Sequence, residues 1–311
     1  MALHRLLEME IGVPDPARLD DFYREIGFTG GHGSWGAADQ PGQIKVVEAP
    51  YRQLRSVRLG CEHEADLAAT AARLDGLGVK YQSGGGRLKV TDPINAWDFV
   101  VEPAAPFDVS PQPVRAMNRP GERNRLGARA EVITEATPRP PRRLGHLVVG
   151  TPKPVETIRF FTEGIGYRVS DTIGGGIAAF LRCSPDHHNM LVAPGAVPYL
   201  NHYALEHDDF DAVMRAATLY LRAHGDEANL AGPGRHQIGG NIFWYMLDPS
   251  GNIFEYFADM DRIVDDEAWV PRDDWDPSDS WSIWGEKDQP EVFFQPADMQ
   301  QIIDGWSRAH A

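Results

Sequence analysis

The chain has 311 residues, a formal net charge of −15 and a sequence pI of about 5.1. Nucleic acids and anionic membranes attract basic surfaces, so this charge argues against both as main partners. Apolar residues make up 42% of the chain and charged residues 24%, which is typical of a globular protein long enough for two domains.

Cysteine usage and the N-terminus bear on the cellular compartment. Cys61 and Cys183 are the two cysteines, too few for a disulfide framework, and they fit a reducing environment. The first residues carry no signal-peptide pattern, and no apolar run is long enough to span a bilayer. We therefore expect a cytoplasmic protein.

The first third of the chain alternates predicted strands and helices. Apolar spacing predicts a helix over residues 17–26, ended by Gly27, and a second over residues 66–77, ended by Gly78. Runs of β-branched and apolar residues predict strands over residues 6–13, 45–49, 56–60, 89–91 and 98–102.

The same order of elements returns from residue 144. The segment GVPDPARLDDFYREIGF (12–28) parallels GTPKPVETIRFFTEGIGY (150–167), which has one inserted residue. EADLAATAARL (64–74) parallels DFDAVMRAATL (209–219), and TDPINAWDF (91–99) parallels LDPSGNIFE (247–255). Three matched segments in one order indicate a duplicated module of roughly 120 to 140 residues.

The repeat divides the chain into four parts. We expect an N-terminal domain over residues 1–112, a linker over 113–143, a C-terminal domain over 144–262 and a tail over 263–311. The linker is rich in Arg and Pro and cannot build a core. The tail holds five of the eight tryptophans, so we expect it to pack on the body or on a neighbouring subunit.

The stretch 234–255, GRHQIGGNIFWYMLDPSGNIFE, carries the strongest functional signal. It predicts a strand over 241–247, a tight turn at Asp248-Pro249-Ser250-Gly251 and a second strand from Asn252. Glu255 then lies within the apolar run of this second strand. A bare carboxylate buried there costs several kcal/mol unless it is paired or bound to a metal.

The two halves differ at three strand positions. The repeat alignment places His146 opposite Glu8, His202 opposite Val57 and Glu255 opposite Phe99. Either histidine taken alone fits a structural role in a strand. Together, two imidazoles and a carboxylate on one module predict a metal site with open positions, of the kind used by non-haem Fe(II) oxygenases. The first half is then a copy without metal.

Residues 234–255 resemble the signature of the type I extradiol ring-cleaving dioxygenases of the vicinal oxygen chelate superfamily. The match runs from Gly234-Arg235-His236 through Trp244-Tyr245 and Asp248-Pro249-Ser250-Gly251 to Glu255. Trp244 departs from the pattern, which has an aliphatic residue or Phe there. The resemblance implies an α+β fold of two tandem domains, each built from paired βαβββ modules that form a curved mixed sheet around the site.

The resemblance also implies the chemistry. Its metal ligands are His146, His202 and Glu255, holding Fe(II), with Mn(II) also compatible. Its catalytic residues are His188, His236 and Tyr245, with His187 left open as an alternative to His188. The implied reaction is extradiol (meta) cleavage of a catecholic aromatic by O₂, giving a ring-opened semialdehyde or dienoate during aromatic degradation. Members of the family are usually homo-oligomers.

Each of the proposed catalytic residues also has a purely structural interpretation. His187 and His188 fit turn residues, His236 a surface histidine and Tyr245 a core residue. Two other functions compete for the whole chain: a glyoxalase-type isomerase that uses Zn or Ni, and a non-catalytic protein that binds an aromatic or a drug. No basic cluster suggests a carboxylate-binding pocket, which favours a neutral mono- or bicyclic catechol.

Overall fold

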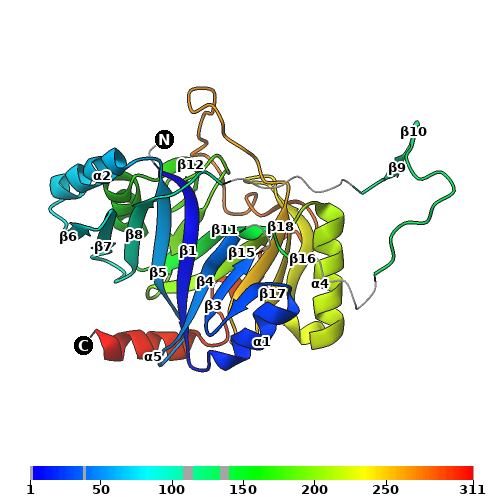
Figure 1. Ribbon diagram of the computed structural model, residues 1–311, viewed down its shortest axis with the longest axis horizontal. Helices are drawn as coiled ribbons and strands as arrows, with labels where there is room; N and C mark the ends of the chain where they lie inside the picture. The colour runs from blue at the N-terminus through cyan, green and yellow to red at the C-terminus, as the bar shows by residue number, and fades with distance from the viewer. Residues whose placement is uncertain (1–2, 38–39, 108–114, 134–139, 311) are drawn as a thin grey trace.

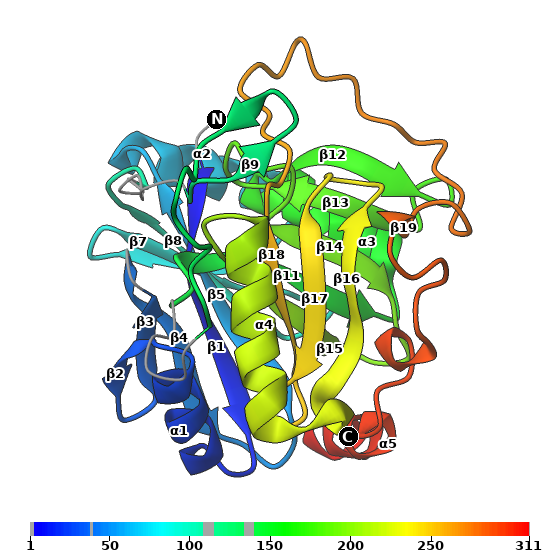
Figure 2. The ribbon, with the colours of Figure 1, turned by 90° about the vertical axis from the view of Figure 1, so that its right-hand side faces the viewer.

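Two large mixed sheets with helices packed between and beside them form the protein (Figures 1 and 2). The computed structural model describes residues 3–37, 40–107, 115–133 and 140–310. One sheet has eight strands in the order β2-β3-β4-β1-β5-β8-β7-β6. The other has nine in the order β12-β13-β14-β11-β15-β18-β17-β16-β19. Each sheet is built from two βαβββ modules, which confirms the α+β tandem architecture.

The N-terminal half supplies the eight-stranded sheet. Its first module is β1 (Leu3–Val13), α1 (Ala17–Glu25), β2 (Thr29–Gly31), β3 (Ser34–Ala37) and β4 (Gln40–Glu48). Its second module is β5 (Gln53–Cys61), α2 (Glu64–Gly76), β6 (Tyr81–Gly84), β7 (Arg87–Thr91) and β8 (Asp98–Pro103). The short strands β2, β3 and β6 were not predicted, because their Gly and Ser residues carry no strand pattern.

The C-terminal half repeats the plan. Its first module is β11 (Arg143–Thr151), α3 (Pro154–Arg159), the π-helix η1 (Phe160–Ile165), β12 (Arg168–Ile173), β13 (Ala178–Arg182) and β14 (Met190–Pro194). Its second module is β15 (Tyr199–Glu206), α4 (Phe210–His224), the short 3₁₀ turn η2 (Asp226–Ala228), β16 (Asn229–His236), β17 (Ile242–Leu247) and β18 (Ile253–Ala258).

The inserted residue in the second copy of the repeat is absorbed by η1. The helix after β11 begins as an α-helix and continues as a π-helix from Phe160 to Ile165, whereas its counterpart α1 is α-helical throughout. A π-turn holds one more residue than an α-turn between the same two ends. The insertion therefore leaves the flanking strands in place.

The first helix of each half packs against the sheet of the other half. Phe22 of α1 contacts Phe254 of β18 edge to face, with ring centroids 5.2 Å apart. Phe161 of η1 contacts Phe99 of β8 in the same way at 4.9 Å. A single buried apolar cluster runs through both halves as a result. This exchange holds the two domains together and leaves the opposite face of the C-terminal sheet free for a site.

Alternation along β11 separates the core from that free face. Leu147 and Val149 belong to the apolar core, and His146 and Val148 line a cavity on the other side. Successive side chains of a strand point to opposite faces, so this split follows from the sequence.

The register of the two sheets corrects two of the three repeat pairings. Val148 of β11 lies opposite His202 of β15, and the equivalent Glu10 of β1 lies opposite Ser56 of β5. The counterpart of His202 is therefore Ser56, not Val57. The loops before β5 and β15 are equally long, and the difference lies upstream, where β13 and β14 are further apart in the chain than β3 and β4. No matched segment fixes the alignment between that point and His202.

Glu255 corresponds to Val100 rather than Phe99. In the parallel pairs, Tyr203 lies opposite Phe254, and Val57 lies opposite Phe99. The turn before β8 is one residue longer than the turn before β18, as the hydrogen bonds that close the two turns show. Asp92 N–H donates to the carbonyl of Trp97, five residues on. Asp248 N–H donates to the carbonyl of Asn252, four residues on.

The pairing of His146 with Glu8 stands. The N-terminal copy thus has Glu8, Ser56 and Val100 at the three equivalent positions, and these residues do not form a set of metal ligands.

The connection between the halves lies partly outside the described residues. The predicted boundary between residues 112 and 113 falls there, as do residues 134–139 of the predicted linker. The described part of the connection contains the two-stranded pair β9 (Asn118–Arg119) and β10 (Glu122–Arg123), which extends from the body (Figure 1). The proposed domain limits remain predictions.

The C-terminal segment after β18 packs along the body. It contains β19 (Ser282–Trp284), the 3₁₀ turn η3 (Glu291–Phe293) and α5 (Met299–Ala309). Strand β19 pairs antiparallel with the edge strand β16 (Figure 2). Helix α5 lies over both halves, because Ile302 packs with Tyr51 and Tyr199, and Arg52 forms an ion pair with Asp298 at 2.8 Å. No helix in the described part of the chain has the length and apolarity needed to cross a membrane.

Candidate metal centre

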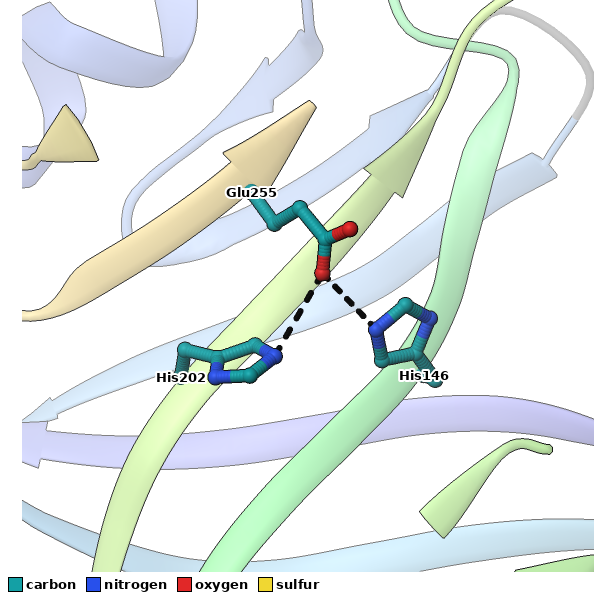
Figure 3. A group of neighbouring side chains, drawn as sticks. All are labelled: His146, His202 and Glu255. Atoms are coloured by element: carbon teal, nitrogen blue, oxygen red, sulfur yellow. Dashed lines mark hydrogen bonds and ion pairs between the residues drawn. The ribbon is translucent and has the colours of Figure 1, made fainter. Parts of the chain in front are cut away.

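His146, His202 and Glu255 converge from three neighbouring strands (Figure 3). They lie on β11, β15 and β18, and their ligand atoms are all within 4.8 Å of one another. His146 Nε2 is 2.9 Å from Glu255 Oε2, and His202 Nε2 is 3.4 Å from the same oxygen. All three side chains are buried, Glu255 completely. The strand order β11-β15-β18 brings together residues that are 109 positions apart in the chain.

Glu255 is held as a carboxylate. Burial alone would raise the pKa of Glu255, but the His146 ring and the nearby His202 outweigh burial and keep the pKa well below its usual value. Its other oxygen, Oε1, accepts a hydrogen bond from the Asn241 side-chain amide at 2.9 Å. One oxygen is thus fixed by Asn241, and the second faces the two imidazoles.

The donor set fits a divalent transition metal. His202 Nε2 is buried and has no hydrogen-bond partner among the described residues, although it lies near a carboxylate oxygen. Burial also lowers the pKa of His202, which favours a neutral ring with a lone pair to offer. Two neutral imidazoles and one carboxylate, all buried and meeting at one point, suit Fe(II) or Mn(II).

His236 and Tyr245 lie beside this group. His236, at the end of β16, has Nε2 2.8 Å from the hydroxyl of Tyr245 on β17. Burial raises the pKa of Tyr245 well above its usual value, so the phenol keeps its proton. Burial lowers the pKa of His236 to about 4, so the ring is neutral near pH 7. Both side chains line the same cavity as His146 and His202.

His187 and His188 occupy different positions relative to the cavity. His188 lines the cavity, with its ring centroid 4.4 Å from that of His146. His187 is fully buried behind it. The Nδ1 atoms of the two rings are 3.1 Å apart, and His187 Nε2 is 3.3 Å from Asp171 Oδ2. Burial lowers the pKa of His188 well below its usual value.

A cavity of about 500 Å³ opens over the candidate metal centre. Most of its wall is apolar, and the tail contributes part of it. Its lining residues are His146, Val148, Ile173, Ile177, Ala178, Phe180, His188, Leu191, Ala193, Pro194, Tyr199, Asn201, His202, His236, Ile238, Tyr245, Pro277, Ser278, Ser280, Trp281, Gln289, Phe293 and Phe294. This set contains no Lys or Arg.

Several residues that complete the site were not predicted from the sequence. Asn241, Asn201, Asp171 and the tail residues Trp281 and Phe293 all contact the histidines or the glutamate, directly or through one residue. Asn241 ends the Gly-Gly-Asn stretch that leads into β17, three residues before Trp244, the neighbour of Tyr245. This stretch is only a weak signal in the sequence. The tail positions gave none, since a backbone carbonyl has no sequence signature.

Residues 143–256 match the sequence model of the Glyoxalase/Bleomycin resistance protein/Dioxygenase superfamily. The matched range begins at β11 and ends just after Glu255, so it contains all three candidate ligands. This part of the chain thus carries a domain of the superfamily, and the chain is similar to extradiol dioxygenases.

Two curated relatives and one solved structure illustrate the relationship. Metapyrocatechase 2 of Cupriavidus necator is 29% identical over 312 aligned positions, covering 94% of this chain and 92% of the relative. The iron-dependent extradiol dioxygenase of Rhodococcus jostii is 29% identical over 46% of this chain and 50% of its own length.

The Mn(II)-bound glyoxalase of Novosphingobium aromaticivorans superposes with a TM-score of 0.73, at 23% identity and over 94% of both chains. At that identity the likeness establishes the fold.

Proposed function

We propose that the protein is an extradiol dioxygenase that opens the ring of a catechol with O₂ at a divalent metal, giving a ring-opened semialdehyde or dienoate. The observation that carries the proposal is the convergence of His146, His202 and Glu255 beside an apolar cavity that the two histidines line. The similarity to Metapyrocatechase 2 over 94% of the chain and to an iron-dependent extradiol dioxygenase over 46% supports it. Fe(II) is the proposed metal, with Mn(II) as the alternative.

His146, His202 and Glu255 would hold the metal, which would supply the activation of the catechol and of O₂. The protein's own task is to manage protons and exclude water. Tyr245, as a neutral phenol, is the proposed hydrogen-bonding partner of a substrate oxygen, and His236, as a neutral imidazole, accepts the Tyr245 proton and holds the phenol in place. The apolar wall limits the access of water to the reacting groups.

His188 is the proposed acid–base residue. Its hydrogen bonds favour a ring whose Nε2 has a free lone pair and can act as a base. Asp171 can only accept, so His187 Nε2 carries the proton of that contact. With that proton on Nε2, the imidazole lone pair of His187 lies on Nδ1 and accepts from His188 Nδ1–H. His188 Nε2 is the nitrogen left to take a proton from a substrate hydroxyl and to return it later. Positioned groups of this kind contribute about 10²–10⁴-fold to rate.

The cavity wall supports an uncharged substrate. No Lys or Arg is among the lining residues, and a substrate carboxylate buried without a cation would lose its hydration uncompensated. We therefore propose a catechol with an apolar substituent or a second ring, for which a cavity of about 500 Å³ leaves room. We further propose a cytoplasmic homo-oligomer, in keeping with the buried free thiols of Cys61 and Cys183.

The test is anaerobic reconstitution with Fe(II) or Mn(II), followed by air and a panel of neutral and carboxylated catechols. We expect O₂ consumption with a yellow ring-opened product from the neutral members. Glu255→Gln should abolish both metal retention and product, whereas Glu156→Gln, an exposed carboxyl on α3, should change neither. Fully metallated protein that leaves every catechol intact would refute the proposal. Isomerisation of a thiol adduct of an α-oxoaldehyde, without O₂ uptake, would instead favour the glyoxalase alternative.

A further inference from the structure

Two backbone carbonyls of the C-terminal segment reach the site histidines. The carbonyl oxygen of Trp281 lies 2.9 Å from His236 Nδ1. The carbonyl oxygen of Phe293 accepts a hydrogen bond from the side-chain amide of Asn201, the residue before His202. A carbonyl oxygen can only accept, so each contact fixes the direction of the hydrogen bonds that follow from it.

The Trp281 carbonyl determines the tautomer of His236. Because the carbonyl accepts, His236 Nδ1 carries the proton of the neutral ring. Nε2 is then an acceptor and receives the hydroxyl proton of Tyr245 at 2.8 Å. The phenol and the imidazole are thereby set in one orientation, with the remaining lone pairs of the Tyr245 oxygen available to a ligand.

The Phe293 carbonyl determines the tautomer of His202 through Asn201. The amide nitrogen of Asn201 must face Phe293, and it also donates to the Tyr199 hydroxyl at 3.4 Å. The amide oxygen is therefore the atom that lies 2.9 Å from His202 Nδ1, and it accepts the proton there. His202 Nε2 is left with its lone pair, near Glu255 and without a hydrogen-bond partner.

The segment that supplies both carbonyls is firmly seated. Strand β19 pairs with β16, so that Ser282 lies opposite His236 itself. The Phe293 ring is 1% exposed and packs edge to face on Tyr245, with centroids 4.7 Å apart. Five residues further on, Asp298 forms its ion pair with Arg52 of the N-terminal half. Both carbonyls are thus held by contacts on either side.

We propose that residues 281–293 fix the proton positions of His236 and His202, and that Asn201 is a positioning residue that presents His202 Nε2 to the metal. His146 provides the contrast, because its Nδ1 has no hydrogen-bond partner in the described structure. The C-terminal segment is then a functional part of the site as well as part of its wall. The inference rests on the proposed function insofar as His202 is a metal ligand.

The first test is made on the metal-free protein and needs no turnover. Long-range ¹H–¹⁵N spectra of protein labelled at histidine nitrogen distinguish a proton on Nδ1 from one on Nε2. Loss of single signals in His202→Gln and His236→Gln assigns the two rings. We expect both rings to carry the proton on Nδ1. A proton on Nε2 of His202 would overturn the proposal, even if the enzyme cleaves catechols.

The second test measures metal affinity by titration of Mn(II) into the metal-free protein. Asn201→Ala removes the acceptor of His202 Nδ1, and we expect affinity to fall by about 10–100-fold, as for other supporting partners of ligating histidines. Asn201→Asp restores an acceptor and should recover most of that loss. Gln300→Ala, an exposed amide on α5, is the matched control and should bind like the unmodified protein. Equal affinity in Asn201→Ala and Gln300→Ala would overturn the role of Asn201.

Discussion

The hydroxyl of Tyr203 donates a hydrogen bond to the carboxylate of Asp248 at 3.1 Å. The hydroxyl of Tyr23, from α1 of the other half, donates in turn to Tyr203 at 3.3 Å. Asp248 begins the turn that leads into β18 and therefore into Glu255. The N-terminal half, which has no metal ligands of its own at the equivalent positions, thus supports the element that presents the carboxylate.

This relationship predicts the effect of Tyr203→Phe. The substitution leaves Asp248 Oδ2 with the Asn252 amide alone, in a site where burial already raises the pKa of Asp248 to about 6. Leaving a buried acceptor with a lost partner typically costs about 1–3 kcal/mol in the free energy of unfolding. Urea unfolding followed by fluorescence should give a lower midpoint with an unchanged slope. An unchanged midpoint would contradict the assigned support.

Tyr245→Phe tests the phenol apart from the metal. The variant keeps the ring that packs on Phe293 but removes the proton donated to His236 Nε2. We expect the bound metal to stay at the level of the unmodified protein, while kcat falls by about 10²-fold, at the lower end of the range for a positioned acid–base group. Metal analysis alongside steady-state O₂ uptake checks both. Full activity in the phenylalanine variant would remove Tyr245 from the proposed mechanism.

We expect the buried side chain of His207 to make the free energy of unfolding depend on pH below neutrality. Burial lowers the pKa of His207 to about 3, whereas an unfolded histidine titrates at about 6.5. Below pH 6.5 the unfolded chain binds a proton that the folded protein takes up only near pH 3. The free energy of unfolding therefore falls as pH drops through this window, and the contribution is fully present above it.

The corresponding variant is His207→Phe, which keeps a ring against Tyr256, 4.5 Å away between centroids, and removes the titrating group. Urea midpoints at pH 7 and pH 5 should differ less in this variant than in the unmodified protein. His32→Asn, an exposed position, serves as the control and should keep the original difference. A variant whose midpoint drops just as far between the two pH values would show that His207 is not the cause.

Close packing around Gly150 of β11 leaves no room for a side chain at this position. A Cβ built there would lie 1.9 Å from Cε1 of the buried Tyr199 ring, which itself packs against α5. Overpacking of this kind typically costs about 1–3 kcal/mol. Gly150→Ala should therefore lower the urea midpoint. Gly76→Ala, where nothing lies within 4 Å, should leave it equal or higher, since alanine reduces the freedom of the unfolded chain.

The sequence predicted the part of the site that depends on the chemical type of the side chains, namely the three candidate metal ligands. His146, His202 and Glu255 were identifiable because a buried carboxylate and two strand histidines are costly or unusual in one copy of a repeat. The structure brings their ligand atoms together. The strands carrying them were also predictable, since β11, β15 and β18 have continuous apolar character.

The errors came from lengths that no local pattern fixes. The turn after Asp92 is one residue longer than its counterpart, and on a strand one residue exchanges the two faces. Val57 and Phe99 are therefore core residues, although the sequence alignment set them opposite His202 and Glu255. Strand β19 was equally invisible, because three residues in a Pro- and Asp-rich segment form a strand only where β16 offers an edge.

The pairing of β19 with β16 has a consequence for association between molecules. β16 ends the row of strands contributed by the repeated modules, and an uncovered strand edge is a template onto which another chain can add. At Arg235 and His236 that template is already used by the protein's own C-terminal segment. Edge-to-edge growth of the sheet is thereby blocked next to the catalytic cavity. A second copy of the chain would have to associate through another edge or surface.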